Sequence, residues 1–407
     1  MGPINDRPAI QMEYGFKPYK LKPHIPRNTQ IPRGRSGHRI VSDNSCMYSF
    51  GGFNPFVEGG DENDDRKLFK EIWKFNIAKG KWKRMNCYSS SLPRQLASNC
   101  VLMKGNWMIV HGGTGLPFGS LNTNKTYITD LKNDTRLKLL PTLGNPPIPQ
   151  YGQAMVLIGH CLYVVGGTSG HEYSSDVHCL DIKTGIWEEV YISKGLSNLE
   201  PQGRYRHEVA FYNSRIIIFG GGTEENVFGF EHLPAFNIET KEWETISTTG
   251  NPKIASGRFY NEAFPAPRRC HSCVQVPESD LQDSEVVICG GFNGLAKFYD
   301  IWILNLRTLQ WRECKQNLLY PTYFHSSSLS PCGQMFIFGG ICEIVAPESE
   351  TTTRRTNEIF SMWVIIPKLK EICWEALLFY SPNITKCSAS KLIDSGVPNE
   401  FVERLQS

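Results

Sequence analysis

The 407-residue sequence lacks the segments that would send a protein through or into a membrane. No apolar stretch of signal-peptide length follows Met1, so we expect no secretory route. The apolar stretch from Ala154 to Val165 is interrupted by Gly159 and His160 and is too short to cross a bilayer. We therefore expect the 13 cysteines to be reduced, and we predict a protein of the cytoplasm, the nucleus or both that makes no membrane contact.

An excess of charge of one sign is also missing. The 43 Lys and Arg residues nearly balance the 40 Asp and Glu residues, and the net charge is +3. Charge alone could not hold a nucleic acid, so we expect no nucleic-acid partner. The short motifs of serine hydrolases, phosphate-binding loops and zinc proteases are missing too, so we expect neither an enzyme nor a cofactor.

Nothing in the sequence indicates a metal site. The acidic run from Asp61 to Asp65 lacks the ligand spacing and turn glycine of a calcium loop, and we expect it to be a solvated loop. Cys270 and Cys273 form a Cys-x-x-Cys pair without a second pair, and strand alternation would place them on opposite faces. We therefore predict no bound metal.

What the sequence does contain is a repeat marked by glycine pairs. Six Gly-Gly doublets each follow a short apolar run, and their first glycines are Gly51, Gly112, Gly166, Gly220, Gly290 and Gly339. The intervals between these glycines are 61, 54, 54, 70 and 49 residues. A period near fifty built from strand-like runs is typical of a propeller array.

Each unit contains four strand-like segments. An alternating segment follows each doublet, as at 71–76 and 300–305, and a turn then leads to a strand opened by tryptophan. The tryptophans are Trp82, Trp187, Trp243 and Trp311, and we expect Leu139 to replace tryptophan in the second unit. Another strand precedes each doublet. Four short strands per unit predict an all-β, six-bladed propeller over residues 31–366.

The sixth unit lacks a clear fourth strand. Residues 357–363 supply a third strand, but no tryptophan strand follows. Residues 12–24, within an N-terminal segment of residues 1–30, could supply the missing strand and close the ring. The alternative is a loose N-terminal tail.

The glycine and tryptophan pattern resembles kelch repeats. No tryptophan is followed by aspartate, which separates the pattern from that of WD40 repeats. The resemblance implies a kelch propeller, a fold that hosts many functions.

After Pro367 the pattern becomes helical. Leu369, Cys373 and Leu377 are spaced four residues apart, as on one face of a helix. Pro398 suits the first turn of a second helix, in which Phe401, Val402 and Leu405 would share a face. Residues 367–407 are too few to form a core of their own, so their apolar faces must pack on the propeller or on a partner.

This tail resembles the partner-binding boxes of kelch-repeat substrate receptors of cullin-2 RING ubiquitin ligases. Residues 369–377 resemble the elongin-binding box, with Leu369, Cys373 and Leu377 at its key positions. The stretch after it resembles a cullin box through three residues, Val397, Pro398 and Phe401. The form is closer to that associated with cullin-2 than to the Leu-Pro-x-Pro form of cullin-5. The resemblance implies that the tail binds elongin C with elongin B, and cullin-2 with its RING subunit.

The resemblance also implies a protein substrate. Receptors of this kind read the extreme C-terminus of a target, often ending in glycine, in a pocket at the propeller's centre. A free carboxylate needs a buried cation, and arginine offers the best-matched donors. Arg35 also opens a blade, and Tyr260 could wall the pocket. The candidate residues are Arg204, Tyr205, Arg206, His207, Arg268, Arg269, His271, Ser272, Tyr323 and Ser326.

Alternatives remain at this point. The histidines and serines could instead satisfy backbone groups between blades. The whole chain could be a scaffold that binds actin or a signalling phosphatase or kinase, with the tail only capping the ring. A copper oxidase can be built on kelch blades, but it is a secreted enzyme with tyrosine and histidine ligands, which this sequence does not favour.

Overall fold

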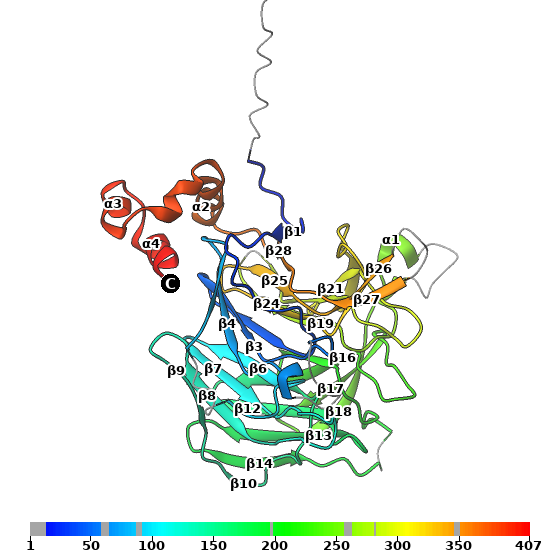
Figure 1. Ribbon diagram of the computed structural model, residues 1–407. Coiled ribbons are helices and arrows are strands. Elements are labelled where there is room, and N and C mark those ends of the chain that lie inside the picture. The colour runs from blue at the N-terminus through cyan, green and yellow to red at the C-terminus, as the bar shows by residue number, and fades with distance from the viewer. Residues whose placement is uncertain are drawn as a thin grey trace, which may run out of the picture.

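Short strands joined into small sheets are the main regular structure in the computed structural model, which describes residues 14–57, 65–86, 92–195, 198–255, 263–280, 282–345 and 351–407 (Figure 1). The first sheet contains β2 (Arg39–Ser42), β3 (Cys46–Phe50), β4 (Ile72–Asn76) and β5 (Lys81–Arg84). The second contains β6 (Cys100–Lys104), β7 (Trp107–His111), β8 (Thr126–Asp130) and β9 (Asp134–Leu139). The third contains β11 (Ala154–Ile158), β12 (Cys161–Thr168), β13 (Tyr173–Asp181), β14 (Ile186–Tyr191) and, parallel to β14, β10 (Leu143–Gly144).

The remaining sheets follow in chain order. The fourth contains β15 (Glu208–Tyr212), β16 (Arg215–Phe219), β17 (His232–Asn237) and β18 (Glu242–Ser247). The fifth contains β19 (Ser272–Val276), β20 (Glu285–Cys289), β21 (Ile301–Asn305) and β22 (Gln310–Glu313). The sixth contains β24 (Ser326–Leu329), β25 (Gln334–Phe338), β28 (Ile359–Trp363) and β1 (Lys22–His24). A small sheet beside it contains β23 (Thr322–Tyr323), β26 (Ile341–Val345) and β27 (Thr351–Arg355).

The sixth sheet joins the two ends of the repeat region. β1 pairs antiparallel with β28, with Lys22 opposite Ser361 and His24 opposite Ile359 (Figure 1). The Tyr19 N–H, just before β1, donates a hydrogen bond of 2.8 Å to the Trp363 carbonyl. The N-terminal segment therefore occupies the outer edge of the last sheet and covers backbone groups that would otherwise be free. Residues 1–13 of this segment, and residues 61–64 of the acidic run, lie outside the described ranges.

The sheets follow one another around a propeller-like ring. Each first strand contacts the first strands of its two neighbours, in the order β2, β6, β11, β15, β19, β24 and back to β2. Apolar side chains fill the space between consecutive sheets. Trp311 of the fifth sheet is fully buried against Phe219 and Phe230 of the fourth, at ring-centroid distances of 6.4 and 5.7 Å. Each sheet thus buries its faces on two neighbours.

The tryptophan positions follow the predicted pattern with one exception. Trp82, Trp187 and Trp243 are buried at the equivalent position in three other sheets. The prediction that Leu139 replaces tryptophan in the second sheet is wrong, because Leu139 is 50% exposed and Leu137 is buried instead. The pairing of β8 with β9 shifts register between Ile128 and Asp130. The residue of β9 that occupies the tryptophan position therefore cannot be found by counting residues from the turn.

The glycine doublets allow close approach between neighbouring sheets. At Gly220 an added Cβ would lie 2.5 Å from the Arg268 carbonyl oxygen of the next sheet. At Gly221 it would lie 2.6 Å from the His207 Cβ, and the φ angles are +57° and +84°. Only glycine fits both the backbone conformation and the space.

The helical tail packs as one unit against the first and sixth sheets (Figure 1). It consists of α2 (Leu369–Tyr380), a 3-10 turn η4 (Pro382–Lys386), α3 (Ala389–Asp394) and α4 (Asn399–Gln406). Short helical turns elsewhere are η1 (Asp65–Lys67) and α1 (Pro252–Ala255). The predicted shared face of α4 is confirmed, since Phe401, Val402 and Leu405 are buried with Trp374. No helix in the described ranges has the length and apolar character needed to cross a membrane.

Candidate functional site

A closed circle of backbone hydrogen bonds lies at the centre of the ring. The second residue before each first strand adopts a left-handed backbone with φ between +55° and +66°. In each case its N–H donates to the carbonyl of its counterpart in the preceding sheet, with N···O distances of 2.6 to 3.2 Å. These six residues are Gly37, Ser98, Gly152, Arg206, Cys270 and Phe324. Four are not glycine, so strain of about 1–2 kcal/mol each is held at this centre.

A small cavity of about 220 Å³ opens above this circle. Its lining comes from most of the sheets and from the three-stranded sheet. The lining residues are Ser36, Gly37, Phe53, Ala97, Ser98, Thr114, Phe118, Tyr151, Tyr205, Arg206, Phe324, Ile341 and Arg355. Below the circle, an ion pair of 2.7 Å between Arg39 of β2 and Glu208 of β15 spans the channel between opposite sheets. The ion pair therefore narrows the channel on the other side of the circle from the cavity.

Arg206 contributes a cation at the floor of the cavity. Its Nη2 group donates to the Ser98 hydroxyl, and its guanidinium lies 4.5 Å from the centre of the Phe324 ring. Its Nε is buried and has no hydrogen-bond partner among the described residues. Burial lowers the pKa of Arg206, because the charged form has lost water. A buried cation in this state favours an added anion.

Two further arginines lie at the same end of the channel. The Arg355 Nε donates to the Ser36 hydroxyl over 3.2 Å, and burial lowers its pKa as well. The Arg269 guanidinium lies 5.6 Å from the Tyr205 ring and 5.1 Å from the Phe292 ring, and its buried Nε has no described partner. In the described ranges, none of Arg206, Arg269 and Arg355 forms an ion pair with a carboxylate.

Aromatic rings form the walls around these cations. The Phe53 and Phe118 rings meet edge to face at 4.9 Å, and the Tyr151 and Tyr205 rings at 6.2 Å. Tyr323 lies outside the cavity lining, 4.8 Å from Phe292 at the same mouth. Burial raises the pKa of Tyr205 to about 12, so its hydroxyl remains a hydrogen-bond donor at neutral pH. The cavity offers cations, donors and flat apolar walls in a space below that of most small-molecule sites.

The structure places Arg204 and Arg268 away from this cavity. Each guanidinium donates to a glycine-doublet carbonyl, at 3.2 Å for Arg204 to Gly220 and 3.1 Å for Arg268 to Gly290. Arg268 also forms a two-pronged ion pair with Asp300, and Arg204 stacks 3.8 Å from the Phe228 ring. Arg35 repeats the same arrangement in the first sheet with Gly51 and Glu71. These arginines join neighbouring segments and are not available to a ligand in the cavity.

The candidate histidines and serines also lie between sheets. The His207 Nε2 bonds to the Val165 carbonyl of the preceding sheet at 3.1 Å. His271 occupies the equivalent position one sheet later and is 2% exposed. The Ser272 hydroxyl bonds to the His325 Nε2 at 2.8 Å, and Ser326 accepts from the Ile40 N–H at 3.0 Å. These contacts favour the structural alternative for His207 and Ser326, whereas Ser272 bonds to another side chain and neither buried ring nitrogen of His271 has a hydrogen-bond partner among the described residues.

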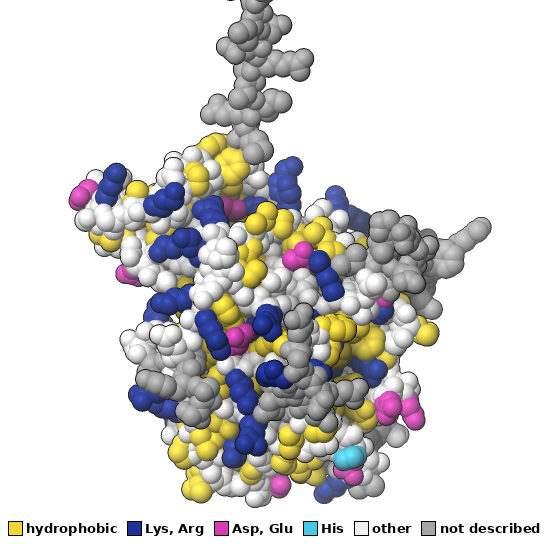
Figure 2. All heavy atoms as spheres, in the orientation of Figure 1, with side chains coloured by type: hydrophobic (Ala, Val, Ile, Leu, Met, Phe, Trp, Pro, Cys, Tyr) yellow, Lys and Arg dark blue, Asp and Glu magenta, His cyan; other side chains and the backbone are white. Residues whose placement is uncertain are grey.

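The tail presents part of its predicted binding face. Leu369 is 72% exposed and Cys373 is exposed, whereas Leu377 packs partly against the helical cluster. Exposed Phe379 and Tyr380 extend the apolar surface towards the end of α2, and hydrophobic side chains are visible at the top of the molecule in Figure 2. The opposite face of α2 is buried, so the helix is held on one side and open on the other.

The three residues predicted to contact cullin-2 divide in the same way. Pro398 is exposed at the start of α4, and Val397 is half-buried. Phe401 is 4% exposed and stacks on Trp374 at 4.8 Å. Phe401 therefore lies inside the tail, where it joins α4 to α2, and only Val397 and Pro398 reach the surface.

Among the cavity residues that the sequence analysis missed are Arg355 and Tyr151. Arg355 ends β27, in a segment outside the repeating strands, so no periodicity marked it. Tyr151 occupies the position of Tyr205 one sheet earlier, and each forms an antiparallel bridge to the residue after a glycine doublet. Alignment of the units on these doublets would have found Tyr151. Tyr260 lies outside the described residues.

Comparison with known proteins gives consistent matches over nearly the whole chain. The model of the KLHDC2/KLHL20/DRC7 Kelch-repeats domain matches residues 54–264 and 197–365. Kelch domain-containing protein 10 of Rattus norvegicus is 41% identical over 387 residues, which cover 95% of this chain and 88% of that protein. The Homo sapiens protein of the same name is 41% identical over 405 residues, with 99% and 84% covered. The Drosophila melanogaster homolog is 39% identical, with 96% and 66% covered.

Proposed function

The chain belongs to the kelch-repeat family that includes kelch domain-containing protein 10, and from that premise we propose that it is the substrate-recognition subunit of a cullin-2, elongin B and elongin C RING ubiquitin ligase. In this proposal the ring is a six-bladed kelch propeller that grips the C-terminal tail of a target. The chain itself performs no chemistry and needs no cofactor, because the recruited ligase transfers ubiquitin. It works in the cytoplasm, the nucleus or both, where that ligase acts.

The observation that carries the proposal is the pair of cavity-lining arginines without carboxylate partners among the described residues, Arg206 and Arg355, with Arg269 beside the lining. A C-terminal carboxylate has two oxygens that match the forked donors of a guanidinium. A main-chain amide within a peptide has no charge to offset the desolvation of Arg206. The ion pair between Arg39 and Glu208 crosses the channel beyond the hydrogen-bonded circle, which disfavours a ligand that passes through the ring. A chain end fits such a cavity, and a continuous loop does not.

The size of the cavity supports a small last residue. Its volume of about 220 Å³ is lined at the floor by Gly37, Ala97 and Ser98. A terminal glycine would let the carboxylate reach the Arg206 guanidinium without a side chain meeting the aromatic walls. Backbone groups further up the tail could then reach the Tyr151 and Tyr205 hydroxyls.

The tail supports recruitment of elongin C through the free side of α2. Leu369 and Cys373 lie on this side, while Trp374 and Glu371 on the other side are buried. A small central Cys would let a partner helix or loop approach closely, and the exposed Leu would enter an apolar pocket. Val397 and Pro398 at the start of α4 would contact cullin-2.

Peptide binding tests the pocket. We expect a peptide ending in a free glycine carboxylate to bind at least about 10-fold more tightly than the same peptide with a C-terminal amide. Arg206→Gly should remove this difference without unfolding the ring, because Gly37 and Gly152 already hold the same backbone conformation. The matched control is Arg215→Gly, which removes a partly exposed arginine at the start of β16, away from the cavity. Equal affinity for acid and amide would remove the carboxylate proposal.

Co-purification tests the tail. Wild-type protein expressed with elongin B and C should retain both, whereas Leu369→Ser or Cys373→Phe should lose them. Ile393→Ser on α3 is the control, since it also changes an exposed apolar residue of the tail. If both variants retained the elongins, the scaffold function considered from the sequence would replace the ligase function.

A further inference from the structure

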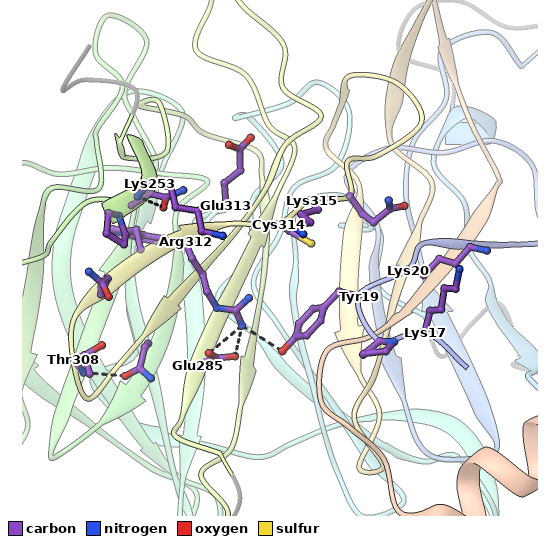
Figure 3. Close-up of a pocket in the computed structure, with 17 residues that line it drawn as sticks. Lys17, Tyr19, Lys20, Lys253, Glu285, Thr308, Arg312, Glu313, Cys314 and Lys315 are labelled. Atoms are coloured by element: carbon purple, nitrogen blue, oxygen red, sulfur yellow. Dashed lines mark hydrogen bonds and ion pairs between the residues drawn. The ribbon is translucent and has the colours of Figure 1, made fainter. Parts of the chain in front are cut away.

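A second groove lies at the outer rim, between β22 and the segment that leads into β1 (Figure 3). Its volume is about 890 Å³, and it shares no residue with the central cavity. Four lysines line it from three stretches that are far apart in the sequence: Lys17, Lys20, Lys253 and Lys315. None of these lysines forms an ion pair with another described residue.

The acidic side chains of the groove do not neutralise these lysines. The Glu285 carboxylate is bound by Arg312, whose Nη2 lies 3.0 and 3.1 Å from the two oxygens. The same Nη2 is 3.3 Å from the Tyr19 hydroxyl, so Arg312 bridges the fifth sheet and the N-terminal segment (Figure 3). Among the described residues that line the groove, Glu313 alone remains to offset four lysine charges. The groove therefore carries a net positive charge.

The groove also contains the open part of a sheet edge. β22 is the outer strand of its sheet, and the Thr249 segment covers it only partly. Thr249 donates to the Leu309 carbonyl and accepts from the Trp311 N–H, both at 2.8 Å. Since alternate residues of a strand point their backbone groups to the same side, the Trp311 carbonyl and the Glu313 N–H face outward as well. No hydrogen bond to these two groups is found among the described residues.

We propose that this groove binds an extended acidic peptide segment of a partner protein, which adds as a strand to the free edge of β22. The Trp311 carbonyl and Glu313 N–H would bond to the peptide backbone. The peptide's Asp or Glu side chains would lie near Lys17, Lys20, Lys253 and Lys315. The site is separate from the central cavity, so one partner could bind at each place at the same time.

The sheet edge favours a peptide over a nucleic acid. A phosphate backbone has no N–H and C=O pattern to match a strand, and the carboxylate of Glu313 at the edge of the groove would repel it. A peptide uses the edge directly and can place its acidic residues to either side of Glu313. Strand addition and charge are thus two independent requirements.

The charge requirement is tested with a labelled twelve-residue peptide of alternating Glu and Thr. The peptide carries a C-terminal amide, so that the central cavity does not contribute, and fluorescence anisotropy of the full-length chain reports binding. Lys17→Glu with Lys315→Glu should weaken binding at least about 10-fold at low salt. The control pair, Lys183→Glu with Lys194→Glu, changes two exposed lysines next to β14 of the third sheet and should leave the peptide affinity unchanged. Equal weakening by both pairs, or no binding by wild type, would overturn the proposal.

The strand requirement is tested at Glu313, where two substitutions have opposite expectations. Glu313→Ala keeps the N–H and removes a repulsive charge, so the acidic peptide should bind as well as or better than to wild type. Glu313→Pro removes the same charge and the N–H as well, and proline is tolerated on an edge strand. It should bind at least about 3-fold more weakly than Glu313→Ala. Equal binding by the two variants, with unchanged melting temperatures, would refute strand addition. A single-stranded oligonucleotide that matched the peptide's affinity in both variants would do the same.

Arg206→Gly separates this inference from the proposed function. That variant should still bind the amidated acidic peptide with wild-type affinity. Loss of acidic-peptide binding in Arg206→Gly would place the peptide at the central cavity and overturn the groove assignment.

Discussion

The ion pair between Glu371 of α2 and Arg404 of α4 offers a sharp test of how the helical tail is held. The Arg404 guanidinium meets both Glu371 oxygens at 2.6 and 2.7 Å, and the two side chains are 6% and 8% exposed. Burial alone would lower the pKa of Arg404, but the hydrogen bonds and charge of Glu371 raise it. The Arg404 carbonyl also accepts from the Asn76 side chain of the first sheet at 2.8 Å. The pair therefore lies where the tail meets the ring.

Removal of one partner should cost more than removal of both. Glu371→Gln leaves a buried cation, a loss of about 3–5 kcal/mol in a dry site. Both side chains also line a cavity of about 550 Å³ that water can enter. We therefore expect Glu371→Gln to weaken the docking of the tail by about 3 kcal/mol, the lower end of this range. That corresponds to a change of more than about 100-fold in the docking equilibrium of the tail. Glu371→Leu combined with Arg404→Leu should cost far less, because no charge is left without a partner.

Hydrogen exchange on α2 to α4 measures this difference directly. Glu371→Gln should speed exchange across the whole tail and leave the inner strands of the ring protected. The double variant should exchange nearly as slowly as wild type. If the single and double variants exchanged at the same rate, the ion pair would not be what holds α2 to α4, and the reasoning would fail.

Three further predictions concern the ring. Burial lowers the pKa of His207 to about 3 from its ordinary value near 6.5, so only the unfolded chain binds a proton here as the pH falls. The free energy of unfolding should therefore fall by about 1.4 kcal/mol between pH 7.5 and 5.5 for this residue. In urea melts over this pH range, His207→Gln, which copies Gln153 one sheet earlier, should remove this part of the decrease. Trp311→Ala should cost about 3–5 kcal/mol in the same melts, because the side chain is fully buried between two sheets. Arg268→Ala should destabilise the ring, because it leaves Asp300 without its partner. The affinity for glycine-ending peptides should stay unchanged. A loss of affinity would show that Arg268 contacts the ligand.

Much of the fold could be predicted from short-range patterns. The glycine doublets and buried tryptophans mark positions where the backbone or the packing allows few alternatives, so they repeat in the sequence as they repeat in space. The exception, Leu139, came from a register shift in β8 and β9 that alternation alone cannot detect. The helices of the tail were visible for the same reason, because their apolar residues follow the helical period.

The candidate site was harder to predict because its residues differ by position rather than by type. Arg204 and Arg206 are two residues apart, but the left-handed backbone at Arg206 turns its side chain into the channel, while Arg204 joins neighbouring segments. A sequence shows two arginines and does not show this turn. Arg355 reaches the cavity from outside the repeat, and Phe401 is buried against Trp374 in a contact between two helices. Both placements depend on tertiary packing.

A reconstituted ubiquitin-transfer assay tests the central claim most directly, since it requires both the pocket and the tail in one chain. The purified chain with elongin B, elongin C, cullin-2 and its RING subunit should modify a reporter that ends in a glycine carboxylate. It should not modify the same reporter with a C-terminal amide, and Arg206→Gly or Cys373→Phe should abolish the activity on the free carboxylate. Equal modification of the acid and amide reporters, or full activity of either variant, would contradict the account.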